Sequence, residues 1–501
     1  MLHNGKVDHK VSPIINQRFT SPAHNQGEQK IEQRGESTKH HGSPPHVLII
    51  GGGIAGLSAA WQLQQQGIGY TLLEATNRLG GMVWSERFDG YVVDGGAESF
   101  ITRKPELWQL TQSLGLADRV VAASTGPSGA AVYNDGQPMR VPLGPLQFLT
   151  TPLLSWRGKL RLLAEPFIPP RRDDGDETIA AFASRRLGAE ASDRFISPIL
   201  SGIYNSDASR QSIMTTAGVM RDLEKHGSLI AGTLATMRKR RAEKQQGVPP
   251  IPRSFTFANG AQEVVDVLAQ KLTGQVRCNA RVVGLSRVDG RYVARLADGT
   301  QLTADGLIIA APASAAAPML APIAPEASKL LGQIRFASIG TIALAFPDAA
   351  VQTKYAINSL MIPRRLQRKI DAIVWRPNSA PAGHTLLRVF FGGATPSTLD
   401  LDDQALVETV CGELAALVGI TAQPLAYRIF RWPNGFPQAD VGHLQLVDRI
   451  EAALPPTISL AGNSYRGIGA PDCARQGVVA ANELGQLLKA TSPAAKAAVA
   501  R

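Results

Sequence analysis

The first apolar segment of the chain predicts a buried strand, a glycine turn and a helix. The strand is His46–Ile50 (HVLII), whose uninterrupted and partly β-branched apolar run is typical of a parallel strand buried on both faces. The turn is Gly51–Gly56 (GGGIAG), which satisfies the pattern G-x-G-x-x-G. Beyond the turn, apolar residues recur on one side of a helix at Leu57, Ala60 and Leu63.

This turn has the residues that dinucleotide binding requires. Gly51 permits the tight turn, Gly53 lets a pyrophosphate approach the backbone, and Gly56 lets helix and strand pack closely. The helix N-terminus offers unpaired N–H groups to the phosphates. A second strand, Tyr70–Leu73, ends at Glu74, at the distance expected for the acid that accepts the ribose hydroxyls. The alternative is a tight turn in an unrelated α/β sheet, and the full strand–turn–helix–strand pattern favours the dinucleotide.

Three later segments alternate between strand and helix patterns. Phe255–Leu272 predicts a strand, a glycine turn and an amphipathic helix. Arg287–Leu302 contains two Asp-Gly turns between alternating segments and therefore predicts antiparallel hairpins. Ile458–Leu488 predicts a strand that ends at Gly462 and a helix that starts near Pro471, because proline is well tolerated in a first helical turn. The inward-facing residues of the first of these helices are Val264, Val265, Leu268 and Leu272.

Two stretches have other patterns. Residues 1–45 are polar and contain no apolar run, so we expect a disordered leader and no secretion signal. Residues 108–250 are helical in pattern but broken by proline clusters. No stretch reaches the roughly 18 apolar residues of a spanning helix, so any membrane contact is expected to be peripheral.

Composition and charge narrow the class of protein. The 501 residues are 44% hydrophobic and 19% charged, which excludes wholesale disorder, a fibrous protein and a polytopic membrane protein. The net charge of +11 permits nucleic acid, anionic lipid or a polycarboxylate as partner, or is simply a basic surface. The basic run Met237–Lys244 contains no aromatic residue, so we expect no nucleic acid binding. The cysteines Cys278, Cys411 and Cys473 match no metal or disulfide spacing, which predicts a reducing compartment and no metal site.

Two further motifs identify a superfamily. The segment Arg78–Gly81 (RLGG) resembles the R-x-G-G element of the flavoproteins that include amine oxidases, phytoene desaturases and protoporphyrinogen oxidases. Tyr91–Phe100 (YVVDGGAESF) resembles the superfamily segment that passes beside the isoalloxazine ring. The resemblance implies FAD as the cofactor. The FAD contacts expected from the turn and the resemblance are Gly51, Gly52, Gly53, Ile54, Ala55, Gly56, Glu74, Ala75, Arg78, Gly80, Gly81, Gly95, Gly96, Ala97, Glu98, Val282, Trp432, Gly462, Asn463, Ile468, Gly469 and Ala470.

Within the superfamily, three segments resemble the protoporphyrinogen and coproporphyrinogen oxidases. They are residues 176–213, residues 431–443 (RWPNGFPQADVGH) and residues 462–473 (GNSYRGIGAPDC). Amine oxidases carry an acidic residue where this chain has Asn463. Ala439 stands where the family has an aromatic residue, and Asn205-Ser206 departs from the family's V-x-A-G-D stretch, so fine substrate contacts are expected to differ.

The family resemblance implies a reaction. A porphyrinogen, either coproporphyrinogen III or protoporphyrinogen IX, undergoes six-electron oxidation to the porphyrin in haem biosynthesis through one FAD. Oxygen reoxidises the flavin and yields hydrogen peroxide. The flavin supplies the chemistry, so no dedicated catalytic side chain is expected, and His384 and His443 are predicted to be structural. Arg103 and Lys104, in a segment similar to that of the bacterial coproporphyrinogen III enzymes, are the candidates for binding the substrate's propionates.

The predicted fold is α/β, with a discontinuous Rossmann-like FAD-binding domain, a substrate-binding α+β domain and a helical insertion. The FAD-binding parts are 46–100, 251–320 and 446–490, the substrate-binding domain is 321–445, the helical substrate-capping or membrane-facing lobe is 101–250, and the tail is 491–501. The resemblance implies a cytoplasmic protein, with contact to the inner face of the cell membrane and to ferrochelatase left open. The rivals are an amine oxidase, a carotenoid desaturase, and a flavin-binding haem-pathway protein without turnover.

Overall fold

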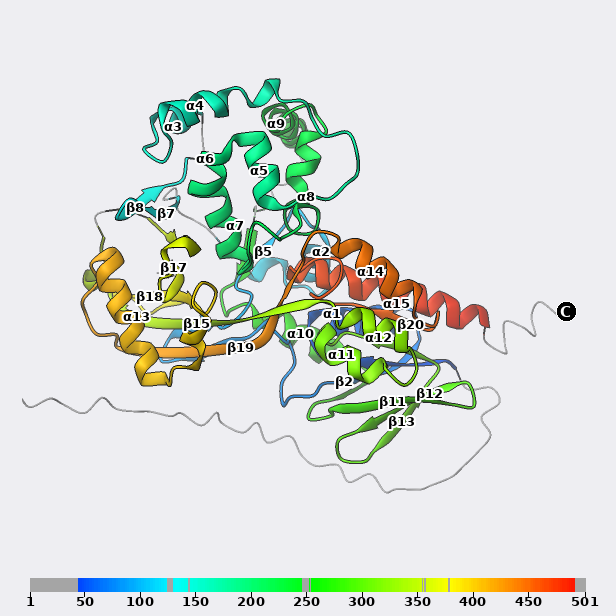
Figure 1. Cartoon of the computed structure of the whole chain (residues 1–501). Coiled ribbons are helices and arrows are strands. Elements are labelled where there is room, and N and C mark those ends of the chain that lie inside the picture. Colours follow the sequence, from blue (N-terminus) through cyan, green and yellow to red (C-terminus); the bar gives the residue numbers. More distant parts are fainter. Residues whose placement is uncertain are drawn as a thin grey trace, which may run out of the picture. The chain divides into compact units, whose positions relative to one another are not determined.

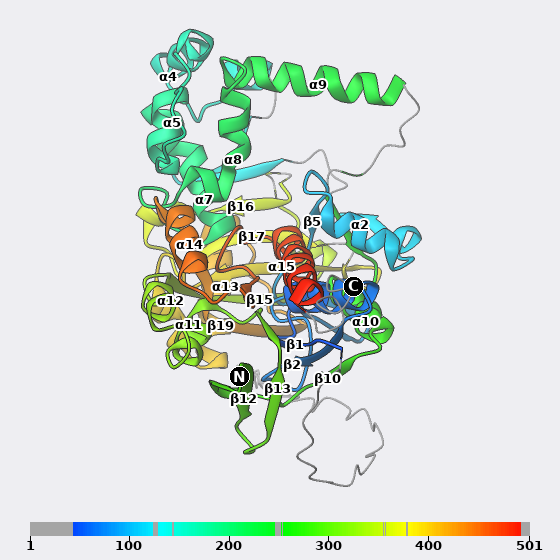
Figure 2. The same cartoon turned by 90° about the vertical axis from the view of Figure 1, so that its right-hand side faces the viewer.

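A five-stranded parallel sheet carries the first glycine turn (Figures 1 and 2). The computed structural model describes residues 44–123, 129–142, 145–245, 252, 254–353, 355, 357–376 and 379–491. The predicted leader up to residue 43 and the tail from residue 492 lie outside these residues. The strand order is β10 (Gln275–Arg277), β2 (Gly69–Leu73), β1 (His46–Ile50), β14 (Gly306–Ile309) and β20 (Ile458–Leu460). The strands come from three distant parts of the chain, so the predicted discontinuous α/β architecture is confirmed.

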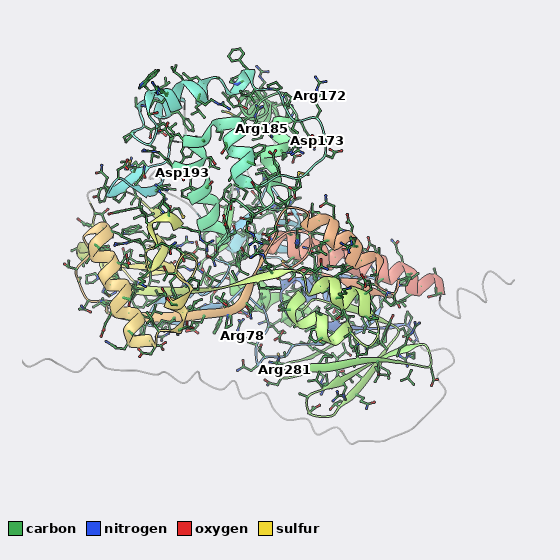
Figure 3. All side chains as sticks on the ribbon, in the orientation of Figure 1. Arg78, Arg172, Asp173, Arg185, Asp193 and Arg281 are labelled. Carbon is green, nitrogen blue, oxygen red and sulfur yellow. The ribbon has the colours of Figure 1, made fainter. Side chains whose placement is uncertain are left out.

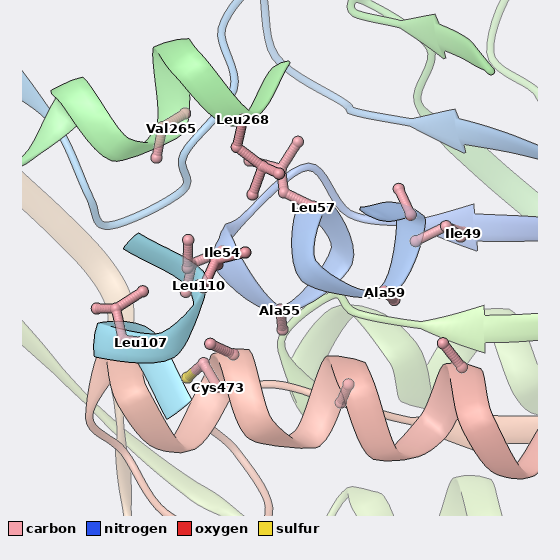
Figure 4. Close-up of a cluster of buried hydrophobic side chains, with 14 of the residues drawn as sticks. Ile49, Ile54, Ala55, Leu57, Ala59, Leu107, Leu110, Val265, Leu268 and Cys473 are labelled. Atoms are coloured by element: carbon pink, nitrogen blue, oxygen red, sulfur yellow. The ribbon is translucent and has the colours of Figure 1, made fainter. Parts of the chain in front are cut away.

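Alternate residues of β1 enter different cores, as the two-residue period of a strand requires. Val47 and Ile49 face a core that includes the helices α1 (Ile54–Gln65), α10 (Gln262–Lys271) and α15 (Ala470–Thr491). Figure 4 shows part of this core, in which side chains from α1, α10 and α15 meet Leu107 and Leu110 of α2 (Glu106–Ser113). Helices α1 and α15 lie so close that a Cβ atom on Gly477 would overlap the carbonyl oxygen of Ala55.

Leu48 and Ile50 enter the core on the other side of the sheet. That core is built by a three-stranded antiparallel sheet and three helices. The elements are β11 (Val282–Val288), β12 (Arg291–Leu296), β13 (Gln301–Ala304), α11 (Ala313–Leu320), α12 (Pro325–Leu331) and α14 (His443–Ala452). The hairpins predicted from the two Asp-Gly turns are thus present, as β11 pairs antiparallel with β12 and β12 with β13.

A seven-stranded sheet forms the second large layer. Its order is β19 (Ala426–Gln438), β15 (Arg335–Pro347), β18 (His384–Phe391), β17 (Ile370–Arg376), β16 (Ser359–Met361), β7 (Ala130–Asn134) and β8 (Gln137–Arg140). One face packs on α13 (Asp403–Val418) through residues such as Ile342 and Phe391. The opposite face packs on Tyr91 and Val93 of β4 (Tyr91–Asp94), which pairs with β3 (Ser85–Phe88) and leads directly into Gly95.

The helical insertion is shorter than the predicted 101–250. Its helices are α3 (Pro145–Thr150), α4 (Trp156–Leu163), α5 (Ile179–Leu187), α6 (Ala189–Ala191), α7 (Ser197–Tyr204), α8 (Ile213–Glu224) and α9 (Leu229–Gln245). Before it, α2 packs into the core beside α15, and the strands β5 (Phe100–Ile101) and β6 (Val120–Ala122) both pair with β9 (Ser254–Phe257). The strands β7 and β8 belong to the seven-stranded sheet. Sequence pattern misses these assignments because they depend on pairing with strands far along the chain.

Buried charges hold this insertion together. The fully buried guanidinium of Arg186 pairs with the buried Glu165, and Glu224 accepts from Arg185 at 2.6 Å and from Arg221 at 2.5 Å. Figure 3 shows Arg185 among these helices. Breaking a buried pair of this kind leaves an uncompensated charge, so the cluster fixes how the helices pack.

Candidate functional site

The glycines of the first turn are required for two different reasons. Gly51 has φ +115°, and a Cβ atom there would lie 2.7 Å from the backbone of Ala310. A Cβ atom on Gly56 would overlap the carbonyl oxygen of Gly51. These two glycines are therefore needed by the fold itself. Gly53 has an ordinary φ of −72°, and the nearest atom to a Cβ there is the Cα of Gly81 at 4.0 Å. The protein leaves open the space in front of Gly53.

A second glycine loop faces that space. Gly80 donates its N–H to the carbonyl of Gly52 at 2.8 Å, and Gly80 and Gly81 both have positive φ angles, of +105° and +58°. A Cβ atom on Gly81 would meet only the Cα of Gly53, at 3.3 Å. The two loops thus present bare backbone to each other at the start of α1. No side chain of the described residues caps this helix start, so its N–H groups are available to an anion.

Glu74, at the end of β2, lies beside the first turn. Its Oε2 accepts from the N–H of Gly52 and its Oε1 from the N–H of Thr76, both at 2.8 Å. The N–H of Ala280 donates to the carbonyl of Glu74, which brings the nearby start of β11, and with it the buried Val282, to the same end of the sheet. Ala75, half-buried, follows Glu74 directly. These predicted residues therefore gather at one edge of the parallel sheet.

Arg78 lies between the second glycine loop and two tryptophans. Its Nη2 donates to the carbonyl of Gly81 at 2.6 Å, and its guanidinium lies 4.1 Å from the ring centre of Trp84 and 5.9 Å from that of Trp432. Burial lowers the pKa of Arg78 from its usual range. Since the guanidinium stays charged at any physiological pH, it places a fixed positive charge beside the two glycine loops, Gly51–Gly56 and Gly80–Gly81, which together we call the cradle.

Side chains of the seven-stranded sheet hold the segment Gly95–Glu98 in place through hydrogen bonds and ion pairs. The carbonyl of Gly95 accepts from Trp432 Nε1 and from Thr341 Oγ1, each at 3.0 Å, and that of Gly96 accepts from Arg388 Nη2 at 2.7 Å. The N–H of Ala97 donates to the carbonyl of Met82 at 2.9 Å. A Cβ atom on Gly95 would overlap the ring of Phe430, and one on Gly96 the carbonyl of Met82. This glycine pair is therefore needed for packing against protein rather than for open space.

Glu98 ends the gripped segment in an ion-pair cluster. Its carboxylate accepts from Arg388 Nη1 at 2.6 Å and pairs with Arg376 on its other oxygen. Burial raises the pKa of Glu98, but the charges of Arg388 and Arg376 outweigh burial and lower the pKa to about 2. The sequence analysis missed Arg376 and Arg388, although an arginine inside the apolar strand HTLLRVFF is a signal that it meets a buried acid.

The last glycine loop precedes α15. Gly462 and Gly467 have φ angles of +137° and +123°. Asn463 donates from Nδ2 to the carbonyl of Gly435 at 3.4 Å, so it lies against the strand that carries Trp432. The remaining predicted residues of this loop are Ile468, Gly469 and Ala470, at which α15 begins. Gly462 and Gly51 both lie against the backbone of Ala310, so the structure brings this loop beside the first glycine turn.

The two predicted substrate ligands lie in different surroundings. Lys104 Nζ pairs with the buried carboxylate of Asp472 at 2.5 Å, and the same carboxylate accepts from the N–H of Gly469 at 3.3 Å. The charge of Lys104 is therefore used to hold the start of α15. Arg103 is exposed. Sequence reasoning could not pair Lys104 with Asp472, because the two residues are 368 positions apart.

A cavity of about 550 Å³ is lined in part by β19, the strand that carries Trp432. Its lining includes Arg364 and Arg431, the half-buried Phe336, Asn205 at the end of α7, and Pro433 next to Trp432. The cavity is not predictable from sequence pattern, because its lining combines residues of the strands β15 and β19 with loop residues that are adjacent only in the folded protein. The tandem arginines Arg364-Arg365 after Pro363 were the local signal.

The histidines His384 and His443 each bond to a tyrosine near the glycine-rich segments. His384 Nδ1 bonds to the hydroxyl of Tyr91 at 2.7 Å, and His443 Nε2 bonds to the carbonyl of Tyr465 at 2.8 Å. Burial lowers the pKa of His443. Among the described residues, no three His, Cys, Asp or Glu side chains form a group able to hold a metal. None of the helices in the described part of the chain combines the length and apolar character needed to cross a bilayer.

Comparison with known proteins gives a consistent result. Residues 54–485 match the family model described as flavin containing amine oxidoreductase. The coproporphyrinogen III oxidase of Bacillus subtilis (strain 168) is 33% identical over 460 residues, covering 87% of this chain and 97% of the relative. That of Propionibacterium freudenreichii subsp. freudenreichii is 30% identical over 493 residues, covering 90% of this chain and 92% of the relative.

Solved structures agree in fold. A crystal structure from Exiguobacterium sp. 255-15, provisionally named a protoporphyrinogen oxidase, matches with a TM-score of 0.76 and 27% identity, covering 89% of this chain and 100% of the other. The cyclohexylamine oxidase of Brevibacterium oxydans IH-35A matches with a TM-score of 0.65 over 89% of this chain and 99% of its own. At 17% identity, the second match shows a shared fold alone.

Proposed function

The chain belongs to the flavin-containing amine oxidoreductase family, and we propose that it is an oxygen-dependent oxidase that converts coproporphyrinogen III to coproporphyrin III. Family membership confirms the resemblance predicted from the motifs, and the protein is an FAD-dependent oxidoreductase. The observation that carries the choice of substrate class is the similarity, over nearly their whole length, to relatives named coproporphyrinogen III oxidase. The neutral Asn463 also distinguishes the chain from the amine oxidases. By the resemblance noted above, amine oxidases are expected to carry an acidic residue at this position.

The residues of the cradle fit FAD. The open space between Gly53 and Gly81 accepts a group that approaches bare backbone, and the uncapped start of α1 favours an anion such as the pyrophosphate. Arg78 supplies a fixed positive charge beside the same loops. Glu74 holds the turn through Gly52 and Thr76, and each carboxylate oxygen can accept a further hydrogen bond, here from the ribose hydroxyls.

When bound, FAD would supply the acceptor for a hydride from a bridging carbon of the substrate and the route of the electrons to oxygen, which would yield hydrogen peroxide. The protein itself positions the reacting groups and shields them from solvent. Trp432, Thr341 and Arg388 fix the carbonyls of Gly95 and Gly96, so the segment expected beside the ring system is held rigidly by the seven-stranded sheet. The reaction needs no dedicated acid or base, and rigid placement is the main contribution we assign to the protein.

The substrate's propionates require positive charge. We assign one propionate to Arg103, which is exposed and just follows the segment that leads from Gly95. Lys104 is placed to support this region indirectly, because its ion pair with Asp472 ties the same segment to the start of α15. Lys104 reaches a substrate carboxylate only by giving up that pair.

The helical insertion has the surface expected of a peripheral membrane contact. Phe167 is 85% and Trp156 66% exposed. Other large apolar side chains are exposed on the helices α3, α4 and α9 of the insertion. The set is Leu149, Trp156, Leu160, Leu163, Phe167, Ile230, Leu234 and Met237, which we call the apolar lobe surface. Arg157 and Arg238 are exposed on the same helices. Apolar and basic side chains together suit an anionic lipid surface, and we place the protein in the cytoplasm against the inner face of the membrane. Contact with ferrochelatase stays a prediction.

An aerobic assay on the purified holoenzyme tests the proposed function. Coproporphyrinogen III and protoporphyrinogen IX are supplied separately, while porphyrin fluorescence and peroxide are followed together. We expect coproporphyrin III to form well above the autoxidation rate, with three peroxides for each porphyrin because six electrons leave in pairs. Protein stripped of FAD and buffer alone serve as controls.

Each other outcome has a defined meaning. Faster oxidation of protoporphyrinogen IX would overturn the choice of substrate and leave the reaction class standing. If neither porphyrinogen is oxidised while FAD is bound and reducible, the porphyrinogen oxidase proposal fails, and amines and polyenes become the substrates to test.

A further inference from the structure

The cavity of about 550 Å³ has the size and the lining of a small-molecule site rather than of a packing defect. Phe336 and Leu399 give it apolar walls. Gly392 and Gly393 also line it, and a Cβ atom on either would overlap a neighbouring side chain, that of Leu399 or of Asn205. Two arginines, Arg364 and Arg431, contribute polar groups. An apolar pocket with a few convergent cationic groups suits a flat apolar molecule that carries carboxylates.

The two arginines differ in what they already bind. Arg431 is committed, because its Nη1 donates to the carboxylate of Asp403 at 2.7 Å and its Nη2 to the carbonyl of Leu401 at 2.8 Å. Among the described residues, the Arg364 guanidinium forms no ion pair and one hydrogen bond, from Nη2 to the carbonyl of Gly393, although it interacts electrostatically with Asp207 and Asp371. A guanidinium has five N–H donors in a fork that matches a carboxylate. Arg364 is therefore a half-buried cation with donors to spare.

Neighbouring groups hold Arg364 in place. The carboxylate of the buried Asp371 accepts from the N–H of Gly393 and of Ala394, both at 2.7 Å, which fixes the carbonyl that Arg364 binds. Asp371 is thus occupied with backbone and does not pair with the arginine. Asp400 also lines the cavity, but this carboxylate is exposed at its edge, where solvent screens its charge.

The cavity shares a wall with the region proposed to bind FAD. Pro433 lines the cavity, Trp432 beside it bonds to Gly95, and Gly435 accepts the hydrogen bond from Asn463. The lining also contains Asn205, which lies beside Gly393 and donates to the carbonyl of Ser338 at 3.4 Å. Asn205 belongs to the stretch in which this chain departs from the pattern of the resembling family.

We propose that this cavity is a carboxylate-binding subsite in which Arg364 holds a propionate of the tetrapyrrole and favours substrates with more propionates. The inference rests on the proposed function. Coproporphyrinogen III carries propionates at two positions where protoporphyrinogen IX carries vinyl groups, so a further arginine discriminates between the two. Arg364 is a substrate-binding residue in this proposal, whereas Asp371 is a positioning residue that acts through Gly393.

The test compares Arg364→Gln with Arg365→Gln in the FAD-loaded protein. Arg365 is the next residue on the same turn, but it is exposed and donates to Asn134 Oδ1 at 2.6 Å, away from the cavity lining. The probes are coproporphyrin III and protoporphyrin IX, whose binding is followed by fluorescence, together with steady-state oxidation of both porphyrinogens. Loss of a charge-assisted hydrogen bond should raise the Kd for coproporphyrin III about tenfold or more in Arg364→Gln. We expect the KM for coproporphyrinogen III to rise with kcat nearly unchanged, and Arg365→Gln to resemble the wild type.

The outcomes separate this inference from the proposed function. If the wild type oxidises coproporphyrinogen III and Arg364→Gln keeps both Kd and KM, the subsite is wrong and the function stands. If the wild type oxidises no porphyrinogen but Arg364→Gln still weakens binding of coproporphyrin III, the subsite stands and the function falls. Should Arg364→Gln lose FAD or fold poorly, Asn205→Asp decides, because it adds a negative charge to the cavity lining beside Gly393 with little change in side-chain size, and this charge must also weaken coproporphyrin III binding. Unchanged binding by Asn205→Asp would overturn the subsite.

Discussion

At the scale of single residues, the glycines of the turn Gly51–Gly56 are present for different physical reasons. Gly51 and Gly56 are required by the protein's own packing, since a side chain at either position would meet backbone. Gly53 adopts a backbone conformation open to any residue and faces empty space bounded by Gly81. The fold does not require glycine at position 53, so we attribute this glycine to a bound ligand. The contrast with Gly51 and Gly56 is the clearest local indication of the cofactor.

This difference predicts opposite behaviour of two alanine variants. Gly53→Ala should change the free energy of unfolding of the FAD-free protein by less than about 1 kcal/mol, because its Cβ has room and only the helix cap changes. It should weaken FAD binding at least about tenfold, because the methyl group occupies the approach of the pyrophosphate. Gly56→Ala should destabilise the FAD-free protein by about 1–3 kcal/mol or more.

Urea unfolding of the stripped proteins and FAD titration by flavin fluorescence measure both effects. Equal destabilisation by the two substitutions would show that Gly53 is also a packing glycine. Full FAD affinity in Gly53→Ala would show that the open space is not where the cofactor approaches.

At the scale of elements, strands of the seven-stranded sheet act as a frame for a segment from another part of the fold. Strands β15, β18 and β19 each donate a hydrogen bond to Gly95 or Gly96, and β17 and β18 each supply an arginine to Glu98. Both arginines pair with the single carboxylate of Glu98. The frame thus ties the FAD-binding part to the substrate-binding part by a charge cluster as well as by packing.

The low pKa of Glu98 predicts how stability depends on pH. The folded-state pKa of about 2 lies below the ordinary value of 4.5, so the ionised carboxylate stabilises the fold above pH 4.5. That contribution, of about 3 kcal/mol, is lost as the pH falls from 4.5 toward 2. Glu98→Gln should lower stability at neutral pH, because it leaves Arg376 and Arg388 without their carboxylate, and should flatten the acid limb of the profile.

Urea unfolding at a series of pH values measures this limb. Glu86→Gln is the matched control, since Glu86 pairs with Arg428 at 3.3 Å in a partly exposed setting, where such pairs contribute little. A profile of Glu98→Gln that is as steep as the wild type between pH 4.5 and 2 would contradict the role of this cluster.

At the scale of the whole molecule, the helical insertion differs from the rest in what it shows to solvent. The two large sheets bury their apolar faces between layers, whereas the insertion has two small cores and leaves the apolar lobe surface uncovered. Exposed apolar side chains beside arginines are typical of proteins that rest on anionic lipid. A substrate with both apolar and carboxylate groups fits a protein that works at such an interface.

Vesicle binding tests this surface. The wild type should sediment with vesicles of equal parts phosphatidylglycerol and phosphatidylcholine, and less with phosphatidylcholine alone. Replacing Trp156 and Phe167 together by glutamate should reduce binding at least about tenfold, because two large apolar side chains no longer enter the bilayer. Leu425→Glu, at a site 55% exposed and outside the insertion, should bind as the wild type does. Equal binding by the double variant, or no binding by the wild type, would rule out the apolar lobe surface as the contact.

The sequence by itself determined the units whose causes are local. The strand and glycine turn at 46–56, the helix after them, the two Asp-Gly hairpins and the start of the last helix near Pro471 are all confirmed, because period, turn chemistry and capping act over a few positions. Family, cofactor and reaction class follow from motifs of the same short range. The glycine positions of those motifs lie where backbone conformation or close approach leaves little choice.

Tertiary structure decided everything that depends on residues far apart in the chain. It paired Lys104 with Asp472, placed Arg376 and Arg388 on Glu98, and put residues 130–140 into a sheet. It also built the cavity at Arg364 from strand and loop residues that are far apart in the sequence. Charges and cavities have no sequence period, because their partners are chosen by three-dimensional proximity and by the energy of burying a charge, neither of which is written in neighbouring residues.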